Sequence, residues 1–284
     1  MSEPIPIFAL ASGRSGTLHL ARLMALNTVD CACRHEPYFD RGNPTLFGPP
    51  IDWAAAGDVA RIRALLTDKR AAIARYGTGH YLETSHAFLK SAYTAAAEVF
   101  PNLRLIHLIR DPLKVAQSEA NREALVRRLR LPGRHYRGGD GQTYFRWALT
   151  GKEAIFGAFR DEALTPLQWY LLQWLEIENR AMAFLAEHGL ASRCFTLRVP
   201  EDLNDAEQIE RLLAFHGLTR RPGPLRRPRR RNLNPFQPTR IGAEQERQAR
   251  AVLARLPDGY LALLRQAPYS RCAWRERFLS LAPG

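Results

Sequence analysis

The amino-acid sequence predicts an α/β domain in which a mostly parallel sheet is flanked by helices. Short apolar runs alternate along the chain with longer segments of helical periodicity, as in strand–helix–strand units. The 284 residues are 46% hydrophobic and 24% charged, which is ordinary for a globular protein with a sizeable core. No internal repeat is present, so we expect a single domain over residues 1–284.

Two apolar runs carry the prediction of buried strands. The run 5–10 ends in a glycine loop, and the run 103–109 ends at Arg110. The expected strands are 5–10, 29–34, 80–84, 103–109 and 193–199. The expected helices are 16–27, 58–76, 87–100, 112–125, 165–189 and 205–216, with one before residue 165 and two from about 243 and 260.

Three segments are expected to lack regular structure. Residues 40–56 and 131–142 are rich in glycine and proline, and the second is interpreted as a mobile loop. Residues 220–239 are basic and contain five prolines. We interpret 126–143 and 220–239 as loop insertions over the binding face of the domain.

The net charge of +13 indicates anionic partners, such as nucleic acid, a membrane surface or a phosphate- or sulfate-bearing ligand. Arginines cluster at 122–137 and 220–231, and guanidinium groups suit oxyanions. Solvated loops would give the same pattern. No helix-turn-helix, zinc-finger or RNA-recognition signature accompanies the charge, so an Arg-rich nucleic-acid-binding protein is kept only as an alternative.

The chain is expected to be soluble and cytoplasmic, without stable membrane insertion. Its first residues lack the basic and apolar pattern of a signal peptide, and no apolar stretch reaches about 18 uncharged residues. The four cysteines form no CxxC pair and no histidine spacing completes a zinc pattern. Neither a metal site nor a structural disulfide is expected.

The first candidate site is the segment Ser12–Thr17, between the first strand and the first helix. A helix N-terminus offers free N–H groups, and glycines let the backbone approach an anion closely. Strand, glycine loop and helix together indicate a P-loop-type fold. Thr17 follows Gly16 where a Walker loop has lysine, and no strand ends in an acid suited to magnesium, which disfavours a P-loop small-molecule kinase using ATP and Mg²⁺.

The second candidate site runs from Arg110 to Ser118. Asp111 and Pro112 are a suitable cap and first residue for a helix, and Ser118 follows Arg110 by eight positions. That spacing is a little over two helical turns, so both side chains can lie on one side. A guanidinium and a hydroxyl near a helix start would bind a second anionic group.

These motifs together resemble those of the PAPS-dependent sulfotransferases, in particular the bacterial and carbohydrate-type members. The Ser12–Thr17 segment resembles their 5′-phosphosulfate loop, and Arg110 with Ser118 resembles their 3′-phosphate motif. The segment 197–203, running into 212–218, is similar to the family's RYEDL and FLGL tail, although Val199-Pro200 stands where a tyrosine is usual. The resemblance extends from residue 7 to about 218.

The resemblance implies an enzyme that moves a sulfuryl group from PAPS (3′-phosphoadenosine-5′-phosphosulfate) to a hydroxyl or amine by in-line displacement. Adenosine 3′,5′-bisphosphate is then the product, and no metal is needed. Arg14 would stabilise the leaving 5′-phosphate oxygens. The cofactor would be bound by Ser12, Gly13, Arg14, Ser15, Gly16, Thr17, Leu18, Arg110 and Ser118, with Arg231 and Asn232 closing over it.

Three residues are candidates for the base that takes the acceptor's proton. Glu36 follows the second expected strand, as an acid does in similar bacterial and tyrosylprotein enzymes, and is favoured. His86, after the strand 80–84, is the alternative. His35 is the third candidate, but it should point away if the strand persists.

The acceptor is not identified by the sequence. A small molecule, a glycan or a peptide would each suit the arginines and the aromatic residues of 126–143 and its flank, and no nucleic-acid partner is expected. The oligomeric state is not predicted.

Overall fold

The computed structural model describes residues 3–38, 40, 42–77, 79–228 and 240–283. Its centre is a five-stranded sheet of order β2-β3-β1-β4-β7 in which every pairing is parallel, which confirms the predicted fold class. The strands are β1 (Ile5–Ala11), β2 (Cys31–Arg34), β3 (His80–Glu83), β4 (Arg104–Arg110) and β7 (Cys194–Val199).

The apolar runs form strands because both faces of the sheet are covered. Side chains alternate along β1 between two hydrophobic clusters. Ile7 packs with Leu20 of the first helix, whereas Phe8 packs with Phe88 on the opposite face. All four are fully buried. A strand between two cores is apolar at successive positions, as the sequence of β1 is.

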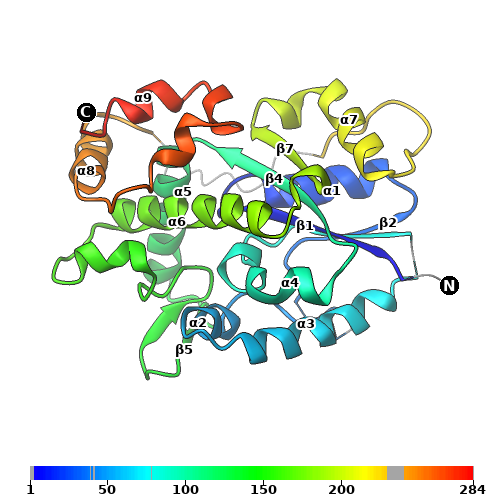
Figure 1. Cartoon of the computed structure of the whole chain (residues 1–284), viewed down its shortest axis with the longest axis horizontal. Coiled ribbons are helices and arrows are strands. Elements are labelled where there is room, and N and C mark those ends of the chain that lie inside the picture. The colour runs from blue at the N-terminus through cyan, green and yellow to red at the C-terminus, as the bar shows by residue number, and fades with distance from the viewer. Residues whose placement is uncertain (1–2, 39, 41, 78, 229–239, 284) are drawn as a thin grey trace.

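Helices cover the sheet on both sides (Figure 1). One face carries α1 (Thr17–Asn27) and α7 (Ala206–His216). The other face carries α3 (Val59–Ala74), α4 (Tyr93–Val99), α5 (Pro112–Arg128) and α6 (Pro166–Glu187), and α8 (Ala243–Leu253) packs against α6. Short 3-10 helices lie at 191–193 and 202–204.

Two segments expected to be loops are regular in part, and for those parts the expectation was wrong. Within 40–56, α2 (Pro49–Ala55) begins with two prolines, which fit the first turn of a helix. Within 131–142, β5 (His135–Arg137) pairs antiparallel with β6 (Thr143–Phe145). Figure 1 shows this hairpin beside α2. The Gly139 N–H in the hairpin loop donates a 2.9 Å hydrogen bond to Asp52 of α2.

Three expected helices are shorter or broken. The helix over 87–100 divides into a 3-10 turn (Phe88–Lys90) and α4, where the Ser91 hydroxyl hydrogen bonds to the Leu46 and Ala87 carbonyls. The helix before 165 is a 3-10 helix, 154–159. The helix from 260 becomes 3-10 turns at 262–265 and 269–271 followed by α9 (Arg275–Leu279), because Pro268 cannot continue a helix.

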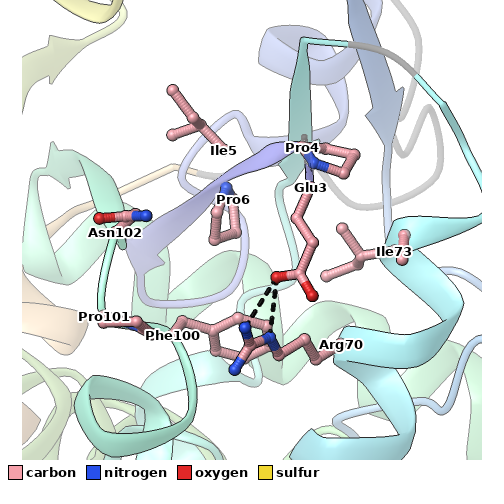
Figure 2. Close-up of a pocket in the computed structure, with 10 residues that line it drawn as sticks. Glu3, Pro4, Ile5, Pro6, Arg70, Ile73, Phe100, Pro101 and Asn102 are labelled. Carbon is pink, nitrogen blue, oxygen red and sulfur yellow. Dashed lines mark hydrogen bonds and ion pairs between the residues drawn. The ribbon is translucent and has the colours of Figure 1, made fainter. Parts of the chain in front are cut away.

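A small cavity lies at the amino end of β1 (Figure 2). Its volume is about 50 Å³, and the Glu3–Arg70 ion pair of 2.8 Å crosses it. Small-molecule sites usually enclose about 300–1,000 Å³. This cavity is therefore too small for a nucleotide. Within the described residues, no helix has the length and apolar character needed to cross a bilayer.

Candidate functional site

The predicted site residues gather at the carboxyl ends of the strands. The glycine loop follows β1, Glu36 follows β2, His86 follows β3 and Arg110 ends β4. Because these strands are parallel neighbours, their carboxyl ends open onto the same edge of the sheet. Ligands of open α/β sheets bind at that edge.

The loop after β1 has the form of an anion cradle. The Ser12 and Ser15 hydroxyls lie 2.9 Å apart and both residues are buried. Arg14 and Gly16 hold left-handed backbone, with φ of 61° and 85°. No described side chain caps α1, which starts at Thr17. The first N–H groups of α1 are thus left for an anion at the positive end of the helix.

Two glycines of this loop are required by close packing. A Cβ at Gly16 would lie 2.9 Å from a methyl carbon of Leu203, so the segment after β7 closes on the loop. A Cβ at Gly13 would lie 1.6 Å from Oε1 of Glu119. A carboxylate of α5 therefore rests directly against the predicted phosphosulfate loop.

The two predicted anion sites are in direct contact. Arg110 donates a hydrogen bond from Nη1 to the Arg14 carbonyl, and Arg14 Nε donates to the Ser118 hydroxyl at 3.0 Å. Asp111 caps α5 by accepting from the Leu113 N–H at 3.0 Å, which fixes the helix that carries Ser118. Burial lowers the pKa of both arginines. Guanidinium groups remain charged despite such shifts, so two cations face this edge.

Glu36 is held in a buried position with few polar partners. Only 15% of its side chain is exposed. Trp147 donates a 3.0 Å hydrogen bond from Nε1 to Glu36 Oε2, and His86 Nε2 lies 3.0 Å from Oε1 without the alignment of a hydrogen bond. Burial raises the pKa of Glu36, and the nearby Arg122 opposes the rise. A carboxylate with a raised pKa suits a general base.

His86 and Lys90 form a buried pair beside Glu36. Lys90 Nζ lies 3.2 Å from His86 Nδ1 and also donates to the Trp147 carbonyl. Burial lowers the pKa of His86 well below its ordinary value and lowers the pKa of Lys90 to about 7. Lys90 stands four residues after His86, a spacing that brings side chains together on a helical turn.

An ion pair from α5 completes the cluster. Arg122 Nη2 lies 2.7 Å from Glu119 Oε2, although neither group is aligned for a hydrogen bond. The Arg122 guanidinium also lies 5.2 Å from the Phe145 ring centre and 5.3 Å from that of Trp147. Two acids, Glu36 and Glu119, are thus offset by Lys90 and Arg122.

Lys90 and Glu119 also belong to the site, although neither was among the residues predicted from the sequence. Glu119 directly follows the predicted site residue Ser118, and Arg122 lies one helical turn after Ser118. This helical spacing is the feature of the sequence that could have placed Glu119 near the site. His35 Nδ1 donates to the Thr84 carbonyl at 3.2 Å, and its ring is close enough to His86 to act on the pKa of that residue. The structure therefore brings Glu36 and His86 into contact, with His35 nearby.

Arg231 and Asn232, which were predicted to contact the cofactor, lie outside the described residues. Over the part of the chain that is described, no group of three or more His, Cys, Asp or Glu side chains could hold a metal ion.

Comparison with known proteins gives likenesses in structure only. No family model matches the sequence, and no curated protein matches it. The chain is similar to a sulfotransferase from Alicyclobacillus acidocaldarius, with 17% identity, a TM-score of 0.49, and 95% of this chain and 99% of that one covered. It is also similar to a sulfotransferase domain from the curacin biosynthetic pathway, with 15% identity, a TM-score of 0.45, and coverage of 98% and 97%.

A third similar structure is the sulfotransferase domain of the Synechococcus PCC 7002 olefin synthase, with 12% identity, a TM-score of 0.43, and coverage of 99% and 89%. All three are sulfotransferases, the family that the motifs of this chain resemble.

Proposed function

We propose that this protein is a PAPS-dependent sulfotransferase that transfers a sulfuryl group to a hydroxyl or amine of an acceptor. The observation that carries the proposal is the contact between the glycine loop and the Arg110–Ser118 motif, beside the buried Glu36 carboxylate. A donor with two separated anionic groups and a base for the acceptor fits this arrangement.

The residues present suit the donor. The uncapped start of α1 and the hydroxyls of Ser12, Ser15 and Thr17 would hold the 5′-phosphosulfate. Arg110 and Ser118 would hold the 3′-phosphate, which distinguishes PAPS from ATP-like ligands. Arg231 and Asn232 would close over it. The donor supplies an activated sulfur–oxygen bond, so the protein has to position the reactants and stabilise charge.

The reaction is an in-line displacement. The acceptor oxygen or nitrogen forms a bond to sulfur, the bond from sulfur to the bridging oxygen breaks, and its electron pair remains on the 5′-phosphate. Arg14 stabilises the charge on that leaving phosphate. Glu36 takes the proton that the acceptor loses. The products are the sulfated acceptor and adenosine 3′,5′-bisphosphate.

Transfer of radioactive sulfur tests this function. The protein is incubated with sulfur-35-labelled PAPS and a mixture of glycans, small hydroxyl compounds and tyrosine peptides, without magnesium. We expect labelled product with the wild-type chain and not with Arg14→Ala. Label transfer from γ-labelled ATP and Mg²⁺ instead would support the kinase, and binding of DNA or RNA unaffected by Arg14→Ala would support the nucleic-acid alternative.

A further inference from the structure

Lys90 is an unusual residue in the cluster because it is a fully buried lysine that has no hydrogen bond to a carboxylate among the described contacts. The residue is 1% exposed, and Lys90 Nζ contacts His86 Nδ1 and the Trp147 carbonyl. The other fully buried lysine, Lys69, instead forms an ion pair of 2.8 Å with Glu83. Burial of a cation is costly unless its hydrogens are used. The partners of Lys90 therefore require an explanation.

The chemistry of these partners determines where the His86 proton lies. An ammonium group has three donors and no acceptor, and a carbonyl only accepts. Facing an ammonium, His86 Nδ1 must accept, so a neutral His86 carries its proton on Nε2. Burial keeps His86 neutral by lowering its pKa well below the ordinary value. Nε2 is the atom that lies 3.0 Å from Glu36 Oε1.

Burial disfavours the protonated form of Lys90, and the acids around it partly offset that effect. Glu119, Glu36 and Glu153 act to raise its pKa, whereas burial and Arg122 lower it, with a result of about 7. Below about pH 7 the ammonium form therefore predominates. The charges of Lys90 and Arg122 balance the carboxylates of Glu36 and Glu119. A second proton on His86 would add an unbalanced buried charge.

We propose that Lys90 is a positioning residue that fixes His86 as the Nε2–H tautomer, so that an N–H group faces Glu36 Oε1 at 3.0 Å and Glu36 takes the acceptor's proton. The tautomer follows from the contacts of a protonated Lys90, whereas the catalytic consequence rests on the proposed function. The proposal also excludes one of the three candidate bases. His86 cannot act as the base, because one ring nitrogen is protonated and the other accepts from Lys90.

Nitrogen-15 NMR of histidine-labelled, full-length wild-type protein tests the tautomer without any variant. The His86 signals are identified by their loss in His86→Gln, since the chain has eight histidines. At about pH 6, which is below the Lys90 pKa of about 7, we expect a protonated Nε2 and an unprotonated Nδ1 on His86. A protonated Nδ1 with a bare Nε2, or a doubly protonated ring, would overturn the proposal.

Two lysine variants with a matched control separate positioning from a merely structural role. Lys90→Met removes the donor, and we expect His86 to lose its single tautomer. Lys90→Arg retains a donor without an acceptor, and we expect it to restore the Nε2–H form. Lys69→Met removes an equally buried lysine elsewhere and should leave the His86 signals unchanged. If Lys69→Met disturbs them as much as Lys90→Met, Lys90 has no specific role.

The catalytic consequence is measured separately. In Lys90→Met we expect kcat of sulfuryl transfer to fall by at least tenfold while the Kd for adenosine 3′,5′-bisphosphate stays within about twofold, with Lys90→Arg recovering much of the rate. An unchanged kcat would contradict the positioning role. If wild-type protein binds no adenosine 3′,5′-bisphosphate, the proposed function fails, and the NMR result on the tautomer stands independently.

Discussion

Arg14 and Glu36 share an uncommon backbone conformation. Their φ angles are 61° and 47°, and among the described non-glycine residues only Arg130 is also positive. Left-handed backbone costs an ordinary residue about 1–2 kcal/mol. Two of these three residues are the ones proposed to meet the leaving phosphate and the acceptor proton. Such strain concentrates at functional sites, where the surrounding packing enforces a side-chain direction.

Replacing Glu36 by glutamine should remove the base while preserving the shape of the site. We expect transfer to slow by about 10²–10⁴-fold, the usual contribution of general-base catalysis. Because burial raises the pKa of Glu36, the wild-type rate should rise with pH through a value above that of an ordinary glutamate. Glu98→Gln, on the surface, serves as the control. A fully active Glu36→Gln enzyme would exclude this base.

The buried amine of Lys90 should make stability depend on pH. Burial lowers its pKa to about 7 in the folded chain, against an ordinary value of 10.5. Between these two pKa values the unfolded chain binds a proton that the folded chain does not, so the free energy of unfolding rises with pH. Below about pH 7 both states bind the proton, and the stability gained at higher pH is absent. Lys69, whose pKa burial also lowers, acts in the same direction.

Lys90→Met should therefore flatten, without abolishing, the rise in the free energy of unfolding between about pH 7 and about pH 10. Urea unfolding at several pH values provides the measurement. A slope in Lys90→Met as steep as that of the wild type would mean that Lys90 is protonated in the folded chain throughout this range.

At the scale of elements, the strands were predictable and several connections were not. A strand such as β1 is buried on both faces, and its continuous apolar run records that burial in the sequence. Glycine and proline mark both α2 and the β5–β6 hairpin, and the same residues mark irregular loops, so composition could not separate them. The hairpin matters to the site, because Trp147 follows it closely and reaches Glu36.

The site was predictable where one motif supplies the contact and hidden where the contact is tertiary. The glycine loop and Arg110 follow strands directly, and the sequence identifies both. The meeting of Glu119 with Gly13 depends on how α5 lies over β1, which no local pattern encodes. Lys90 and Trp147 come from separate segments and meet only in the folded chain.

The close approach of α5 to the loop predicts a sensitive glycine. In Gly13→Ala the new methyl would overlap the Glu119 carboxylate, and we expect a loss of about 1–3 kcal/mol of stability, as for an overpacked site. Gly157→Ala is the control, since a Cβ there meets nothing within 4 Å. Chemical unfolding measures both. Adding Glu119→Ala to Gly13→Ala should recover part of the loss, and strict additivity would contradict the contact.

For the whole molecule, the parallel sheet brings distant segments to one edge. Arg14 and Ser118 are separated by 104 positions and hydrogen bond because β1 and β4 are parallel neighbours. The helices of Figure 1 lie on both faces of the sheet. A ligand bound at this edge contacts several segments at once. It should therefore stabilise the entire fold, by about 2.7 kcal/mol at a concentration of 100 Kd.

Calorimetric titration with adenosine 3′,5′-bisphosphate, without magnesium, tests whether this edge is a PAPS site. We predict micromolar binding by the wild type and a loss of about 10–150-fold in Arg110→Ala, the range for hydrogen bonds to a charged group. Arg104→Ala, at the opposite end of β4, should bind normally. Absence of wild-type binding, together with binding of ATP and Mg²⁺, would contradict the sulfotransferase assignment and favour the kinase.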